Sequence, residues 1–156
     1  MSGSFELDFS VKYQQVGHET SFKPSGLWYS LDNEWVEWCE SNMPEWVKPY
    51  HHILNLEESR LCVIDSLDSL SQFENEFLIK ENSHFEFWVV DWERATKKFS
   101  GIEIRNYYKM KASSSFSEYK KRMWFNGLDV NGGCIWDLSC VTGSELATTN
   151  IEEINF

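Results

Sequence analysis

The sequence contains no apolar run long enough to cross a bilayer and no CxxC pair. A membrane-spanning helix needs about 20 apolar residues, so we predict no membrane partner. The cysteines are isolated and lack the short spacing of zinc sites; they are Cys39, Cys62, Cys134 and Cys140. No basic region precedes an apolar segment at the N-terminus, which argues against a secretion signal. These absences predict a cytoplasmic protein with ordinary thiols and no metal site.

Basic residues are scarce, since the chain has 14 Lys and Arg against 25 Asp and Glu and a net charge of −11. Nucleic-acid binding depends largely on Lys and Arg side chains that displace counterions from phosphates. We therefore expect no direct nucleic-acid binding. The acidity is compatible with a solubilising role, with a basic protein partner, or with mimicry of a polyanion.

The common nucleotide-phosphate motifs GxGxxG and GxxxxGK[ST] are absent, and so is GxSxG. The remaining reactive pairs each have a structural interpretation. We expect His18-Glu19 in a surface loop, His51-His52 on opposite faces of a strand with one ring buried, and Asp91, near Glu86, at a helix N-cap. The pair Gly132-Gly133 has a sufficient role as the entry to a strand.

The chain does contain enough apolar surface for one domain. Its 156 residues are 42% hydrophobic and 16% aromatic, whereas disordered chains are poor in aromatics. The eight tryptophans are expected mostly in the core, although indoles also make good stacking surfaces for planar ligands. We predict a single domain over residues 1–142 and a polar, acidic C-terminal tail over residues 143–156, which is either a mobile end or a final edge element.

Apolar periodicity predicts the elements of the first half. Alternation predicts a strand over Phe5–Val16, and a short strand follows the turn at Pro24 in Gly26–Ser30. Helical spacing predicts a short amphipathic helix over Asp32–Ser41 with Asp32 as its N-cap. Two further strands, His51–Leu56 and Leu61–Ile64, are separated by a polar turn and could form a hairpin.

The second half alternates helices and strands. A helix capped by Ser66 or Asp68 should bury Leu70, Phe73 and Phe77, and a second one, capped by Asp91, should bury Trp92, Ala95 and Phe99 and end at Gly101. Strands are expected at Gly101–Ile104 and after Asn131, with a Ser-rich loop at Ser113–Ser117 and a basic piece at Tyr119–Phe125 between them. The pattern predicts an α+β domain in which about seven short strands form a mixed or antiparallel sheet with three or four helices.

The octapeptide Lys23–Ser30, KPSGLWYS, is the best candidate for a site. Pro24 and Gly26 shape a turn, and Lys23 can meet a phosphate or carboxylate as a point charge. Trp28 and Ser30 lie two apart, so they share one face of a strand and offer a stacking surface beside a hydroxyl. The alternative is that Trp28 is core and Lys23 is simply solvated.

The octapeptide also belongs to a wider pattern. It is followed by Trp35, Trp38-Cys39, Asp91-Trp92, Phe99–Ile102, Tyr107 or Tyr108, Trp124, and Gly133–Asp137. In combination these blocks, spread over roughly residues 11–141, resemble a family of small uncharacterised proteins of T4-like tailed phages. Phe99-Ser100 stands where that family has Tyr-Asp, and Leu128-Asp129 stands where it has Trp-Asp.

The order of blocks is also distantly similar to ADP-ribosyltransferase-like folds. That resemblance implies NAD as a cofactor, with Tyr13 or Gln15 at the first strand position and Trp28, Tyr29 or Ser30 at the second. No glutamate accompanies Gly132–Asp137, so the carboxylate that would stabilise an oxocarbenium-like state would have to be Glu103 or Asp137. The resulting ligand-binding candidates are Lys23, Trp28, Tyr29, Ser30, Tyr107 and Trp124.

These resemblances imply a phage early accessory protein with an ADP-ribosyltransferase-like fold, acting in the cytoplasm of an infected bacterium. It would bind a nucleotide-type ligand, NAD or a nucleotide defence signal, and modify a host target with it. The alternative is a non-enzymatic anti-defence or host-takeover protein that binds and inhibits a bacterial protein through its acidic surface. The incomplete set of catalytic carboxylates favours the non-enzymatic protein-binding function, and the aromatic octapeptide favours the nucleotide-binding function.

Overall fold

The computed structural model describes residues 7–15, 22–48, 50–81 and 87–148, in which eight strands and five α-helices form one small α+β domain. The central sheet has four strands in the order β1-β7-β6-β3. Their bounds are Leu27–Ser30 for β1, Gly132–Ile135 for β7, Gly101–Ile104 for β6 and Leu61–Ile64 for β3. Strands β3 and β6 run parallel, and the other neighbours run antiparallel. The predicted α+β class is confirmed.

The remaining strands form two separate pairs. Strand β2 (Tyr50–Leu56) pairs antiparallel with β8 (Val141–Thr148) in a two-stranded ribbon, and β4 (Leu78–Glu81) pairs antiparallel with β5 (Phe87–Val90). The predicted hairpin of β2 with β3 is therefore wrong. A 3₁₀ turn at Glu58–Arg60 carries the chain from the ribbon into the central sheet, where β3 pairs with β6 instead. Residues 143–148, assigned above to the tail, form an edge element in β8.

The described residues contain five α-helices, and two of them begin at the predicted capping residues. The five are α1 (Glu34–Asn42), α2 (Leu67–Phe77), α3 (Trp92–Thr96), α4 (Tyr107–Ser113) and α5 (Met123–Asn126). The predicted caps of α2 and α3 are confirmed, because Ser66 Oγ accepts a hydrogen bond from Ser69 N at 3.2 Å and Asp91 Oδ1 accepts one from Arg94 N at 3.0 Å.

Two predicted helix boundaries are wrong. Asp32 does not cap α1, because its backbone is left-handed with φ of 51° and Asn33 occupies the cap position. Gly101 does not end α3, which stops at Thr96; instead Gly101 begins β6. Phe99, predicted to be buried by that helix, lies after it and packs partly buried against the core.

The N-terminal segment is not the predicted strand. Within residues 7–15 the only ladder contact is a bridge from Lys12 to Asp137. The Asp8 carboxylate accepts hydrogen bonds from Ser10 N at 3.0 Å and from Ser10 Oγ at 2.6 Å, which makes a local turn in place of a ladder. The outer ends of the predicted strand, His18-Glu19 and Glu86 lie outside the described residues.

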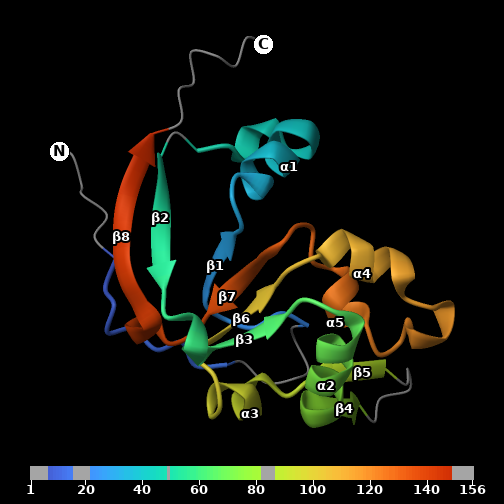
Figure 1. The fold of residues 1–156 in the computed structure, drawn as a ribbon. Helices are drawn as coiled ribbons and strands as arrows, with labels where there is room; N and C mark the ends of the chain where they lie inside the picture. The colour runs from blue at the N-terminus through green and yellow to red at the C-terminus, as the bar shows by residue number, and fades with distance from the viewer. Residues whose placement is uncertain (1–6, 16–21, 49, 82–86, 149–156) are drawn as a thin grey trace.

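The central sheet separates two apolar clusters. Figure 1 shows the β2–β8 ribbon on one side of the sheet and helices α2, α4 and α5 on the other. Alternation along β6 places Ile102 and Ile104 in the larger, helix-side cluster and leaves Glu103 on the ribbon side with β1 residue Tyr29. The ribbon-side cluster is smaller; its buried members are Leu61, Ile135, Leu138, Cys140 and Val141.

The predicted basic piece is not a uniform surface patch. Lys120 and Lys121 are exposed, but Arg122 is buried, and its Nε donates to Glu74 Oε1 at 2.8 Å. A second nitrogen of Arg122 donates to the Ser114 hydroxyl at 2.9 Å, which ties the Ser-rich segment to the core.

Candidate ligand-binding cleft

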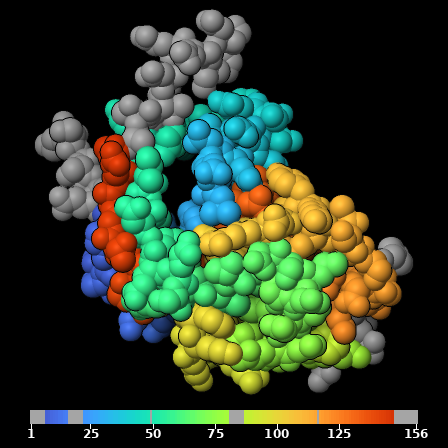
Figure 2. Space-filling view, viewed as in Figure 1, coloured from blue at the N-terminus to red at the C-terminus, as the bar shows by residue number. Residues whose placement is uncertain are grey.

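A cleft of about 1120 Å³ opens at the edge of β1. Strand β1 is the last strand of the central sheet, and β2, which faces it across the cleft, pairs with β8 instead. Figure 2 shows the surface hollowed between these two strands. Both faces of β1 contribute to the lining, and the cleft extends from this edge strand to the core residues Trp92, Ile102 and Trp124.

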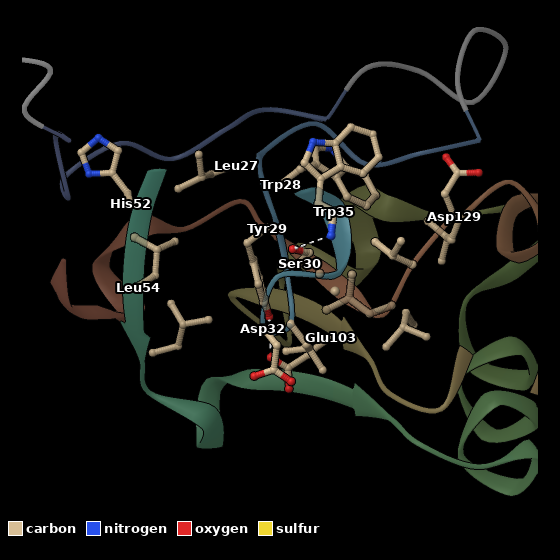
Figure 3. Close-up of a pocket in the computed structure, with 18 of the residues that line it drawn as sticks. Leu27, Trp28, Tyr29, Ser30, Asp32, Trp35, His52, Leu54, Glu103 and Asp129 are labelled. Carbon is tan, nitrogen blue, oxygen red and sulfur yellow. Dashed lines mark hydrogen bonds between the residues drawn. The ribbon is translucent and has the colours of Figure 1, made fainter. Parts of the chain in front are cut away.

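The helix-side part of the cleft is built from the octapeptide. Trp28 is 43% exposed, so the alternative that it is a core residue is wrong. The Lys23 ammonium lies 5.7 Å from the centroid of the Trp28 ring, within cation–π range. Ser30 Oγ accepts a hydrogen bond from Trp35 N at 3.3 Å, so this hydroxyl already holds the start of α1 (Figure 3).

The octapeptide turn needs its glycine and is held by Gln15. A Cβ on Gly26 would meet the Ile135 carbonyl oxygen and would lie 2.7 Å from Cys134 Sγ, so no larger residue fits beside β7. Gln15 Oε1 accepts from Ser25 N at 2.8 Å, while Gln15 Nε2 donates to Ser25 O at 2.9 Å. Gln15 therefore shapes the rim from outside, and neither it nor Tyr13 lines the cleft.

The ribbon-side part contains a buried carboxylate. The Tyr29 hydroxyl donates to Glu103 Oε1 at 2.9 Å (Figure 3). Arg105 Nε donates to Glu103 Oε2 at 2.7 Å. Arg105 also meets Glu58 at 3.3 Å. Burial, together with the Glu103 charge, raises the pKa of Tyr29 far above its usual range, and the hydrogen bond to Glu103 raises the pKa of Arg105. Both Glu103 oxygens are thus occupied by protein donors.

Most of the site residues that were predicted from the sequence line the cleft. Lys23, Trp28, Tyr29, Ser30, Trp124 and Glu103 line it. Trp124 is otherwise buried, and its Nε1 has no hydrogen-bond partner in the described structure. Tyr107 lies apart, buried with its hydroxyl donating to Asn126 O at 3.1 Å.

Asp137 also lies apart from the cleft. Its carboxylate caps a 3₁₀ turn by accepting from Ser139 N at 3.1 Å, and it pairs with Arg60 at 3.2 Å. Lys12 lies 3.7 Å from the same carboxylate. These contacts make Asp137 a structural residue that ties the N-terminal segment and the 3₁₀ turn before β3 to the end of β7.

The sequence did not predict two parts of the cleft lining, which are strand β2 on the side opposite β1 and Trp35 at the rim. The β2 side chains His52, Leu54 and Leu56 line the cleft, as does Trp35 of α1. Figure 3 shows Trp28 and Trp35 at one end of the cleft and Leu54 at the other. No local signal places β2 here, because its position follows from pairing with β8 at the far end of the chain. His51 is half-buried and His52 exposed, so the two rings differ in exposure but neither is buried as predicted.

The described residues contain no group of three His, Cys, Asp or Glu side chains placed to hold a metal ion. All four cysteines are free thiols. Burial raises the pKa of Cys134 to about 12 and that of Cys62 to about 11, so both are thiols at neutral pH. Among the helices that the structure describes, none is long and apolar enough to cross a membrane.

Comparison with known protein families, with curated proteins and with solved structures finds no match for this chain. The phage-family and ADP-ribosyltransferase-like resemblances therefore stay predictions.

Replacing Tyr29 with phenylalanine is expected to cost about 1.5–3 kcal/mol at neutral pH, because the Glu103 oxygen loses a charge-assisted hydrogen bond. Since the pKa of Tyr29 is raised on folding, its contribution to stability is present below about pH 10 and is lost as the pH rises further. The free energy of unfolding of the wild type should thus fall more steeply above pH ~10 than that of Tyr29→Phe. Urea unfolding at several pH values measures both slopes, and equal slopes would contradict the assignment.

Proposed function

We propose that the protein binds a nucleotide-type ligand in the cleft, with the base stacked on Trp28 and a phosphate near Lys23. The observation that carries this proposal is the exposed Trp28 indole with the Lys23 ammonium 5.7 Å from its centroid, at the rim of a cleft large enough for a dinucleotide. Stacking of a base on an aromatic side chain contributes about 1–3 kcal/mol. A lysine contributes a point charge that suits phosphate.

The size and charge of the protein favour a small ligand over a nucleic-acid strand. A net charge of −11 repels a long phosphate backbone, whereas a mononucleotide or dinucleotide places its few charges beside Lys23. NAD has two ring systems joined by a pyrophosphate, and such an elongated ligand suits a cleft that extends around the edge of β1. One ring on Trp28 would leave the other to reach over the edge of β1 towards Tyr29.

The same geometry favours binding over group transfer. Transfer of ADP-ribose requires a carboxylate that stabilises an oxocarbenium-like ribose. Glu103 is the buried carboxylate of the cleft, but Tyr29 and Arg105 hold both of its oxygens. In the phage context that the sequence resemblance implies, we propose that the protein captures NAD or a nucleotide defence signal, with Glu103 as a positioning residue for Tyr29.

A thermal-shift screen tests this proposal with NAD, ADP-ribose and cyclic dinucleotides. A ligand at a hundredfold excess over its Kd stabilises the folded state by about 2.7 kcal/mol. We expect one of these ligands to raise the Tm of the wild type, Trp28→Ala to abolish the rise, and Lys23→Ala to reduce it. Trp46→Ala is the matched control, because Trp46 is 48% exposed and lies outside the cleft. No shift with any ligand, or an equal loss in Trp46→Ala, would contradict the proposal.

A further inference from the structure

Three tryptophans gather on one surface of α1 and the short 3₁₀ turn Pro44–Trp46. The Trp35 and Trp38 rings are stacked with centroids 5.1 Å apart and planes 7° apart, and the Trp46 ring lies 6.2 Å and 6.4 Å from them. Trp35 is 38% exposed and Trp46 48%. We call this set, Trp35, Trp38 and Trp46, the tryptophan face. Exposed indoles in one cluster are unusual on a protein without a partner and mark interaction sites.

The segment that carries the tryptophan face is strongly acidic. Residues 32–46 contain five carboxylates, from Asp32, Glu34, Glu37, Glu40 and Glu45, and no Lys, Arg or His. This segment therefore carries −5 of the net charge of −11. Glu34 is committed to Asn131, whose backbone N and Nδ2 donate to it at 2.8 and 2.9 Å, but Glu37, Glu40 and Glu45 are exposed. The last turn of α1 has no basic residue to offset the helix dipole.

Exposed indoles on an acidic segment are suited to bind arginine and lysine side chains. A guanidinium or ammonium gains from stacking on an indole and from acidic groups on the same short segment. The three rings already pack on each other, and only Cys39 of α1 is buried in the domain, so the face is preformed and its rings are not needed to fill the core. Figure 1 shows α1 set apart from helices α2–α5.

We propose that the tryptophan face docks a basic segment of a partner protein, whose arginine or lysine side chains stack on the indoles. A second copy of the chain is a poorer occupant, because a symmetric contact would bring two segments of charge −5 together. The proposal goes beyond the ligand of the cleft and does not depend on it. Trp38 and Trp46 do not line the cleft, and Trp35 is the one residue that the two surfaces share.

Fluorescence anisotropy tests the docking with a short labelled peptide of alternating arginine and serine. We expect the peptide to bind the wild type, the matched glutamate–serine peptide not to bind, and Trp46→Ala to weaken binding at least about tenfold. Glu45→Gln and Glu93→Gln remove the same charge, one beside the face and one on α3. Only Glu45→Gln should weaken binding measurably. Trp28→Ala should bind the peptide like the wild type, so failure of the cleft proposal and failure of this one are distinguishable.

Several results would overturn the docking proposal. Absence of peptide binding, binding unchanged in Trp46→Ala, or equal weakening by Glu45→Gln and Glu93→Gln would each show that the face does not select basic side chains. Sedimentation velocity at increasing protein concentration addresses the other occupant. A dimer that Trp46→Ala disperses would assign the face to a second copy of this chain.

Discussion

Replacing Arg122 with methionine is expected to destabilise the protein by about 3–5 kcal/mol at neutral pH. The Arg122 and Glu74 side chains are only 7% and 6% exposed, and they meet at 2.8 Å. Removal of the guanidinium leaves the Glu74 carboxylate buried without its cation, which costs far more than the net contribution of the pair. Chemical denaturation gives the free energy of unfolding directly. Lys120→Met, two residues earlier in the chain and exposed, is the control and should change stability by about 0.5 kcal/mol or less.

The loss in Arg122→Met should depend on pH. Burial raises the pKa of Glu74 even in the wild type, and Arg122 opposes that rise. A carboxyl group whose pKa is raised on folding contributes stability below its unfolded pKa and loses it as the pH rises through the folded pKa. Without Arg122 the pKa rises further, so the deficit is largest at neutral pH and shrinks as acid protonates Glu74. The double variant Glu74→Leu/Arg122→Met should recover most of the stability, and a deficit that is the same at all pH values would contradict this explanation.

Replacing Gly133 with alanine is expected to cost about 2–5 kcal/mol, because overpacking adds to a lost hydrogen bond. Strand β7 lies between β1 and β6, and Tyr29 crosses above Gly133 to reach Glu103. A Cβ at Gly133 would meet the Ile102 carbonyl oxygen and would lie 2.6 Å from the Tyr29 hydroxyl oxygen. The ring must therefore move, and the Tyr29–Glu103 hydrogen bond breaks.

The matched control is Gly127→Ala. There a Cβ finds only the Met123 carbonyl oxygen, at 3.7 Å, and φ is −83°, which any residue adopts. We expect no loss, or a gain of about 0.4–1 kcal/mol from reduced entropy of the unfolded chain. Thermal unfolding compares the two variants. A Gly133→Ala protein as stable as the wild type would show that Tyr29 is not confined between β1 and Glu103.

Sequence signals found the elements whose causes are local. Ser66 and Asp91 cap helices because their side chains reach backbone N–H groups three residues on. The strand at Trp28 and the sharing of one face by Trp28 and Ser30 follow from a period of two. Helix α4 was missed, although Tyr107 and Met110 are buried at helical spacing, because it begins after Asn106 in a left-handed conformation with φ of 58°.

The pairing of strands that lie far apart in the chain could not be predicted from the sequence. The alternation in residues 51–56 predicts a strand but not its partner, which is β8, almost at the end of the described chain. For the same reason the sequence indicated Glu103 as a candidate carboxylate but not its contact with Tyr29. The two side chains meet because β7 lies between β1 and β6 and has Gly133, which lacks a side chain, where Tyr29 passes over it. Local alternation also misled at the N-terminus, where the Asp8–Ser10 turn replaces the expected strand.

The most direct test of the proposed function is the set of tryptophan indole N–H signals in a two-dimensional ¹H–¹⁵N NMR spectrum, assigned by single Trp→Phe variants. Among the eight indoles, that of Trp28 reports on the cleft alone and that of Trp46 on the tryptophan face alone, whereas Trp35 belongs to both. Titration with NAD and with ADP-ribose should shift the signal of Trp28 in a saturable way and leave that of Trp46 in place. If the Trp28 signal stays fixed at saturating ligand, or only signals outside the cleft move, the cleft is not a nucleotide site.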